Sequence, residues 1–185
     1  MTTRETIIEL GDQLIREKGY NAFSFYDISR KLKIKNASIH YHFHSKADLG
    51  VSILKDHIHK LSELMTSVAD KKPKIQLKAF LTIYSTIKSE DRVCLVGSLS
   101  TDLKTVEPKM ERELKTFANT ILKWVTTILE EGRNQKAFAF SGTARTKALL
   151  VISNMLAALQ LSRLTSEKDF YVIQEAVVRE LKAYS

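Results

Sequence analysis

Apolar residues recur at intervals of three and four positions through most of the chain, which is the spacing of amphipathic α-helices. The first such stretch follows Thr2-x-x-Glu5, a capping-box pair, and ends at Gly19, where we expect a left-handed C-terminal cap. Its apolar stripe consists of Ile7, Leu10, Gly11, Leu14 and Ile15. The pattern therefore predicts a helix over residues 3–18.

Longer helices are expected farther along the chain. One begins at the capping pair Ser45-x-x-Asp48 and continues to about Val68. After a charged break, Pro73 suits the first turn of the next helix, which reaches Ile87. The helix that begins at Ser45 is the expected connection between an N-terminal head and a larger body.

The second half of the chain follows the same pattern. Segment 91–99 contains a glycine and is expected to form a short helix or a turn. Pro108 opens a long helix that Gly132 is expected to stop, Thr143 caps the next helix, and Ser166 caps the last. The apolar positions of that last helix are Phe170, Ile173, Val177, Val178, Leu181 and Tyr184.

Two short apolar repeats near the N-terminus predict a pair of packed helices. Ile28 and Leu32 lie four positions apart on one helix face. Ile39 and Phe43 repeat this spacing on the following helix, so the two helices can share one apolar seam. Phe23 and Phe25 are expected to fill the rest of a small core.

The polar residues of this stretch suggest what the pair of helices does. Ser24-x-x-Asp27 is a capping pair that starts the first helix, and Lys33-Ile34 is the tight connection to the second. Between Ile28 and Lys46 there is no Asp or Glu, but there are five cationic residues: Arg30, Lys31, Lys33, Lys35 and Lys46. The second helix keeps short polar groups and flat rings on its outer face: Asn36, Ala37, Ser38, His40 and Tyr41. We interpret the stretch as a helix-turn-helix whose second helix enters the major groove of DNA, and the alternative is a solvated basic face.

This stretch also carries a resemblance to a known family. The residues concerned are Ser24-Phe25-Tyr26-Asp27-Ile28-Ser29, Leu32, Ile34, Ala37-Ser38-Ile39-His40-Tyr41-His42-Phe43, Ser45-Lys46 and Leu49. Together they closely resemble the N-terminal signature of the TetR family of transcriptional regulators, from about Thr2 to Lys60. The resemblance implies an all-α homodimer with a helix-turn-helix DNA-binding domain, residues 1–46, and a ligand-binding and dimerisation domain, residues 47–185.

The chain departs from the family pattern at three positions of the motif. Lys35 stands where Ser or Thr is usual, Ala37 where Gly is usual, and His40 where Tyr is usual. Alanine is still small enough for a close approach to DNA. We expect Asn36 to supply the helix cap in place of the missing hydroxyl, and Tyr41 to share the phosphate contact with His40.

Composition and charge agree with a protein that binds an acidic partner. The chain has 185 residues, 44% of them hydrophobic, and a formal net charge of +8. This balance favours nucleic acid without separating DNA from RNA or a membrane surface. A single cysteine, Cys94, excludes an internal disulfide and fits the cytoplasm. No signal peptide is recognisable, and the apolar run 148–161 is too short and too often interrupted to span a bilayer.

Catalytic and metal sites find little support in the sequence. All five histidines lie between His40 and His59, but no carboxylate falls into ligand spacing and no His-Glu-x-x-His motif is present. Cys94 has no histidine near it in sequence, and neither Cys94 nor any serine lies in a nucleophile elbow. We therefore expect no cofactor, no metal and no enzymatic activity, and a helical enzyme with a histidine metal site is the weakest alternative.

The body contains candidates for an effector pocket and for a dimer interface. Aromatic and soft side chains are the pocket candidates, although simple core packing is the alternative for each: Phe80, Tyr84, Cys94, Phe117, Trp124 and Met155. The helix over 148–161 is apolar nearly all round, so it needs cover on more than one side, from a second subunit or from a monomeric core. The interface candidates are Ile152, Leu156, Leu159, Ile173, Val177 and Leu181.

These observations lead to one functional hypothesis and one main rival. The chain is expected to be a repressor that binds a palindromic operator in double-stranded DNA and is released by a small apolar or amphipathic effector, with no membrane partner. Asn36, Ser38 and Tyr41 are the candidates for base edges, with Ala37 allowing close approach. The phosphate candidates are Lys35, His40, His42 and Lys46. The rival is an adaptor or ligand-binding protein that has lost specific DNA binding.

Overall fold

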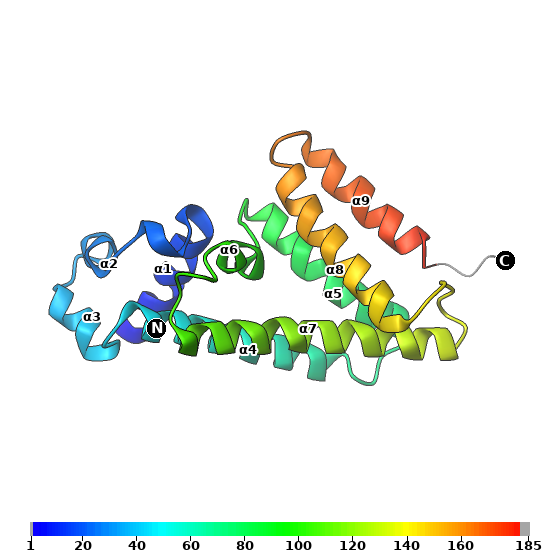
Figure 1. Ribbon diagram of the computed structural model, residues 1–185, viewed down its shortest axis with the longest axis horizontal. Coiled ribbons are helices and arrows are strands. Elements are labelled where there is room, and N and C mark those ends of the chain that lie inside the picture. The colour runs from blue at the N-terminus through cyan, green and yellow to red at the C-terminus, as the bar shows by residue number, and fades with distance from the viewer. Residues whose placement is uncertain (1, 182–185) are drawn as a thin grey trace. The chain divides into compact units, whose positions relative to one another are not determined.

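A computed structural model describes residues 2–181 of the chain, and every regular element in that range is helical (Figure 1). The elements are α1 (Thr3–Lys18), the 3-10 turn η1 (Tyr20–Ala22), α2 (Phe25–Leu32), α3 (Asn36–His42), α4 (Lys46–Ser67), α5 (Pro73–Ser89), α6 (Leu95–Thr101), α7 (Pro108–Asn134), α8 (Ala144–Leu161) and α9 (Glu167–Arg179). The all-α prediction is confirmed. Tyr184, an expected apolar position of the last helix, lies outside the described residues.

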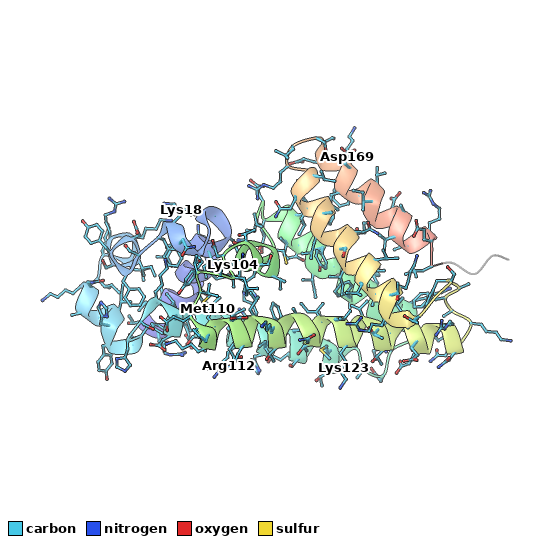
Figure 2. The ribbon with its side chains drawn as sticks, viewed as in Figure 1. Lys18, Lys104, Met110, Arg112, Lys123 and Asp169 are labelled. Carbon is cyan, nitrogen blue, oxygen red and sulfur yellow. The ribbon has the colours of Figure 1, made fainter. Side chains whose placement is uncertain are left out.

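The helix starts follow the capping residues that the sequence indicated. Full capping boxes join Thr2 to Glu5, Ser24 to Asp27, and Ser166 to Asp169. Asp169 lies in the first turn of α9 (Figure 2). Each box satisfies backbone N–H groups that have no carbonyl partner inside the helix. Ser45 and Thr143 also accept backbone hydrogen bonds at the starts of α4 and α8.

The chain folds into two compact units. The first consists of Met1–Lys60 and Val93–Ala118, and the second of Leu61–Arg92 and Asn119–Ser185. Each therefore combines two separate stretches of sequence, because α4 and α7 both continue from one unit into the other. The division differs from a simple split after the helix-turn-helix, since α6 and the start of α7 belong with the N-terminal helices.

The core of the first unit forms around α1, which contacts η1, α2, α3 and α6. Phe23 and Phe25 are buried in it, as the sequence predicted. The second unit is built on contacts of α8 with α9 and with α5. Its aromatic centre contains Phe80, whose ring meets Tyr84 at a centroid distance of 5.4 Å and Trp124 at 6.0 Å. Among the described helices, none is long and apolar enough to cross a membrane.

Gly19 ends α1 in a conformation other than the expected one. Its φ of 88° is positive, as a left-handed cap requires, but its ψ is 159°. The N–H of Gly19 still donates to the Ile15 carbonyl. Because ψ is extended, the chain leaves the helix at once and forms η1, so the expectation of an ordinary left-handed cap was wrong.

Gly132 does not stop α7, which continues to Asn134. The left-handed residue that follows the helix is Lys136, with φ of 56°. Gly132 instead meets the ring of Phe138, which folds back so closely that a Cβ at position 132 would collide with it. Both residues are buried, and the Gly132 carbonyl accepts from the N–H groups of Ala137 and Phe138. The glycine therefore serves the packing of this turn rather than the helix end.

We predict that Gly132→Ala destabilises the protein by about 1–3 kcal/mol, because overpacking outweighs the higher helix propensity of alanine. The measurement is a urea midpoint at fixed protomer concentration. In a Phe138→Leu background the same change should cost much less, since the aromatic ring is gone. An equal cost in both backgrounds would contradict this assignment of Gly132.

Candidate nucleic-acid interface

The position of α3 is fixed by an apolar seam with α2. Ile28 of α2 and Ile39 of α3 are completely buried, and Phe43 just after α3 is nearly so. Burying side chains of this size is worth roughly 1.5–3 kcal/mol each. A helix of seven residues is not stable alone in water, so this seam holds α3 in place and decides which of its faces is exposed.

The connection between the two helices is short and tightly hydrogen-bonded. Lys33 ends α2 in the left-handed conformation, with φ of 56° and ψ of 38°. The N–H of Ile34 donates to the Ser29 carbonyl at 3.1 Å, and the N–H of Ser38 donates to the Lys35 carbonyl at 2.9 Å. The angle between α2 and α3 is therefore set by backbone bonds as well as by apolar packing.

The outer face of α3 displays most of the predicted DNA-binding residues. Lys35, Asn36, Ala37 and His40 are exposed, and Ser38 and His42 are half-buried. Tyr41 is 82% exposed, which is unusual for a ring of that size. The structure thus brings the base-edge and phosphate candidates together on one surface.

Ring contacts stiffen this surface. The His40 ring packs edge-on against Phe25 at a centroid distance of 5.0 Å. Tyr41 and His42 form a second edge-on pair at 5.1 Å. Because Phe25 is buried, the first contact anchors the outer face of α3 to the core. Rigid aromatic groups lose little conformational entropy when a ligand binds them.

The start of α3 corrects one expectation. Its N-cap is Lys35, which makes no side-chain capping bond, and Asn36 is already the first helical residue. An N-cap must have extended backbone, and Lys35 has φ of −71° and ψ of 143°. Asn36 therefore does not replace the usual hydroxyl cap. Its amide is exposed at the end of α3 where backbone N–H groups favour an anion such as a phosphate.

Lys46, the remaining phosphate candidate, has partners within the protein. Its Nζ donates to the Phe23 carbonyl and lies 4.6 Å from the centroid of the Tyr20 ring and 4.2 Å from that of Phe23. Burial lowers the pKa of Lys46, although the carboxylates of Asp102 and Asp27 act in the opposite direction. A phosphate contact requires this side chain to turn outward, so that role stays a prediction.

We expect Lys46→Met to lower the free energy of unfolding by about 1–2 kcal/mol, through the lost hydrogen bond and the lost cation–π contacts. Lys35→Met is the matched control, because it makes the same chemical change at an exposed position. Urea midpoints of the two variants should differ clearly. Equal midpoints would show that the contacts of Lys46 contribute nothing to folding.

One exposed aromatic residue was missed by the sequence reasoning. Tyr26 is 66% exposed on α2, beside the buried Phe25. The signal was present, because Tyr26 lies off the face that Phe25 and Ile28 share with the core. Arg30 and Lys33 are also exposed. These residues of α2 and its connection extend the basic, ring-bearing surface beyond α3.

A polar cluster joins α1, α4 and the segment before α6 within the first unit. Arg16 lies 3.0 Å from Asp12 and donates to the Val93 carbonyl at 3.3 Å. His57 Nε2 of α4 lies 2.9 Å from Asp12 Oδ1. Burial alone would raise the pKa of Asp12, but the His57 hydrogen bond and the charges of His57 and Arg16 together hold that pKa below its usual value.

The sign of the lowered pKa gives a prediction. A depressed carboxyl pKa contributes stability above the unfolded value, about 3.9, and loses it as the pH falls through the folded value. Asp12→Asn should therefore be less stable than the parent at pH 6, and the difference should shrink as the pH falls below about 4. Urea midpoints between pH 6 and pH 3 measure this. The exposed Glu130→Gln is the control, and a pH-independent difference for Asp12→Asn would contradict the assignment.

The predicted pocket residues divide between the two units. Phe80, Tyr84 and Trp124 meet in the second unit, and Met155 is buried there as well. Phe117 packs against His57 in the first unit, at a centroid distance of 6.0 Å. Cys94, also in the first unit, has its thiol pKa raised by burial, which disfavours the reactive thiolate.

The predicted interface residues fall into a buried group and a half-buried group. Leu159, Val177 and Leu181 are buried within the second unit, whereas Ile152, Leu156 and Ile173 are half-buried. Other apolar side chains of the same region face outward instead: Leu149, Leu150, Leu161, Leu164, Tyr171 and Val172. A sequence pattern cannot show which side of a helix with apolar residues all round meets the core.

In residues 2–181 no group of three or more His, Cys, Asp or Glu side chains is placed to hold a metal ion. What the first unit does offer is a rigid, basic and aromatic surface on a helix-turn-helix.

Comparison with known proteins agrees with this geometry. The model of the family "Bacterial regulatory proteins, tetR family" matches residues 7–52, which contain most of α1, all of α2 and α3, and the start of α4. The chain is 27% identical to the HTH-type transcriptional repressor DhaR of Mycobacterium sp. (strain GP1), over 69% of this chain and 66% of that protein. It is 22% identical to the HTH-type transcriptional repressor NemR of Escherichia coli (strain K12), over 84% of this chain and 81% of that protein.

Solved structures extend the likeness to the whole chain. A TetR transcriptional regulator from Legionella pneumophila is 30% identical, with 98% of each chain covered and a TM-score of 0.87. A TetR-family regulator from Agrobacterium tumefaciens is 25% identical, with 97% of each chain covered and a TM-score of 0.91. The helix-turn-helix surface, the family match and these full-length likenesses lead to one conclusion: the chain belongs to the TetR family of bacterial transcriptional regulators.

Proposed function

We propose that this regulator is a repressor, which binds a near-palindromic operator as a homodimer and leaves it when a small amphipathic effector binds. The observation that carries the proposal is the outer face of α3, where exposed polar and aromatic groups stand on a helix fixed by a buried seam. Such a helix suits the major groove of DNA. Two relatives, DhaR and NemR, are transcriptional repressors, which supports repression as the direction of control.

Within this proposal the residues of α3 have distinct roles. Asn36, Ser38 and Tyr41 read base edges, and Ala37 lets the helix backbone approach the DNA closely. Lys35, His40 and His42 contact phosphates on either side of the groove. Base contacts determine which sequence is bound, whereas phosphate contacts determine most of the affinity and its salt dependence.

The homodimer is proposed from the exposed apolar surface of α8 and α9. Leu150 is 52% exposed and Val172 is 61% exposed. A pair of helices with apolar residues left in solvent favours burial against the same pair of a second copy, through a two-fold axis. Two recognition helices would then meet successive major grooves, which are ~34–36 Å apart.

The effector is proposed to act through α4, which begins beside α3 and continues from the first unit into the second. A change in the second unit can reach the recognition helix along this one continuous element. The polar cluster of Asp12, Arg16 and His57 gives α4 a second connection to α1. The protein is proposed to work in the cytoplasm, without catalysis of its own.

The experiment that tests the proposal is selection from a pool of random duplex DNA, repeated at two salt concentrations. We predict a palindromic motif whose half-sites are one helical turn apart, with affinity that falls steeply with salt. Weak enrichment without a motif would contradict the repressor assignment and favour an adaptor.

Variants assayed on the selected duplex refine the same prediction. Lys35→Gln should weaken binding on all sequences and reduce the slope of log affinity against log salt by about 1. Lys123→Gln makes the same change at an exposed position of α7 in the second unit and should leave the slope unchanged. Tyr41→Ala should instead relax the preference for particular bases. If the Lys35 variant keeps the slope of the parent protein, Lys35 does not contact a phosphate.

A further inference from the structure

The second unit contains a groove that the sequence reasoning did not foresee. It has a volume of about 900 Å³ and lies between α5, α9 and the segment that follows α7. This size is within the range of small-molecule sites. None of the aromatic and soft residues predicted as a pocket lines it.

The groove is elongated and has an apolar wall. Its lining on α5 runs from Lys74 to Ser85, which corresponds to roughly 16 Å along the helix axis. Leu77 and Leu81 contribute apolar surface from α5, and Phe138 does so from the segment after α7. This length and surface suit a chain-like ligand better than a compact one.

The register of α5 against α9 determines which residues share an end of the groove. Ser85 of α5 bonds to Gln174 of α9, with a distance of 3.0 Å from Gln174 Nε2 to Ser85 Oγ. Lys88, farther along α5, pairs with Glu167, earlier on α9. The two helices therefore run antiparallel, so the start of α5 lies near the end of α9. The N–H of Ala139 donates to the Leu181 carbonyl and brings the segment after α7 to the same end.

That end of the groove is rich in cations. Lys74 and Lys78 come from α5, Arg179 from the end of α9, and Lys136 from the segment after α7. Within the described part of the chain, none of these four forms an ion pair. A single carboxylate, Glu175, also lines the groove. Four positive charges against one negative charge create a field that favours an anionic group.

The opposite end of the groove carries polar, uncharged side chains. The Gln174 amide donates to the Leu81 carbonyl at 3.2 Å as well as to Ser85 Oγ. These bonds fix the Gln174 side chain and close the gap between α5 and α9 at this point. A ligand that enters from the cationic end therefore reaches an apolar wall first and a fixed polar group last.

We propose that this groove binds an elongated organic anion, with its headgroup among Lys74, Lys78, Lys136 and Arg179 and its apolar chain along Leu77, Leu81 and Phe138. The effector role of this ligand rests on the proposed function, but its binding does not. A ligand wedged between α5 and α9 braces these helices, and α9 carries part of the exposed apolar surface through which two copies are proposed to meet.

The test uses decanoate as the probe, with isothermal titration of the full-length protein and no DNA present. Decan-1-ol has the same chain without the charge, acetate has the carboxylate without the chain, and decyltrimethylammonium has the opposite charge. Decanoate should bind one molecule per protomer, at least about tenfold more tightly than any of the three, since it alone offers both a carboxylate to the cations and a chain to the apolar wall. Equal affinity for decanoate and decan-1-ol, or no binding of decanoate, would overturn the proposal.

Paired variants locate the site. Lys74→Gln with Lys78→Gln should lower the affinity for decanoate at least about tenfold, because two headgroup partners are removed. Lys123→Gln with Lys168→Gln removes the same charge outside the groove and should have no effect, which separates a specific site from the general positive charge of the protein. Both pairs change exposed residues, so we expect each pair to leave the core intact. Equal losses in the two pairs would overturn the proposal.

Ligand binding in the groove and operator binding can fail separately. If decanoate does not bind while the protein still selects a palindromic DNA motif, the groove proposal is wrong and the repressor assignment stands. If decanoate binds as expected and no motif is selected, the groove stands as a ligand site and the repressor assignment is wrong. Decanoate that binds in the groove yet leaves DNA affinity unchanged would refute its role as an effector.

Discussion

The buried seam between α2 and α3 is the interaction on which the function of this regulator depends. Ile28, Ile39 and Phe43 are the side chains that hold a seven-residue helix, one too short to persist on its own, against the rest of the first unit. Because Ile39 occupies the inner face of α3, the polar and aromatic residues of this helix are left to face solvent. The left-handed Lys33 and its backbone bonds then fix the direction of α3. Recognition of DNA thus starts from apolar packing, and the basic residues act on a surface that the packing has already shaped.

Buried polar contacts within the same unit join α1 to α4 and to the segment before α6. Arg16 bridges Asp12 to the backbone before α6, and His57 brings α4 into the same cluster. Removing one partner of such a cluster leaves the remaining charged groups buried without a partner, which lowers the free energy of unfolding. Helix α1, which contacts α3, is therefore joined to α4 and to the segment before α6 by specific polar contacts in addition to apolar packing. An effector that changes α4 would act on these contacts first.

Much of the fold could be predicted from the sequence because its determinants are local. Capping boxes and apolar periodicity placed most helix starts within a residue or two, and the seam of α2 and α3 follows from four spaced side chains. A local pattern could not show which side chains meet from other parts of the fold. In the sequence Gly132 resembles a helix stop, whereas in the structure the close packing of the Phe138 ring is the reason for a glycine at this position. Lys46 has the chemistry of a phosphate ligand, yet two rings and a carbonyl from another segment surround it. The groove between α5 and α9 was likewise invisible, because its cations come from three separated stretches of sequence.

The most direct test of the central claim is amide hydrogen exchange of the full-length protein, with and without the duplex selected from random DNA. We predict that DNA slows exchange chiefly in residues 24–46, which contain α2, α3 and the start of α4. The non-specific control is a scrambled duplex of equal length, which should give weaker protection of the same residues. Protection centred on the second unit, or equal exchange with and without the selected duplex, would contradict the assignment of α3 as the recognition helix.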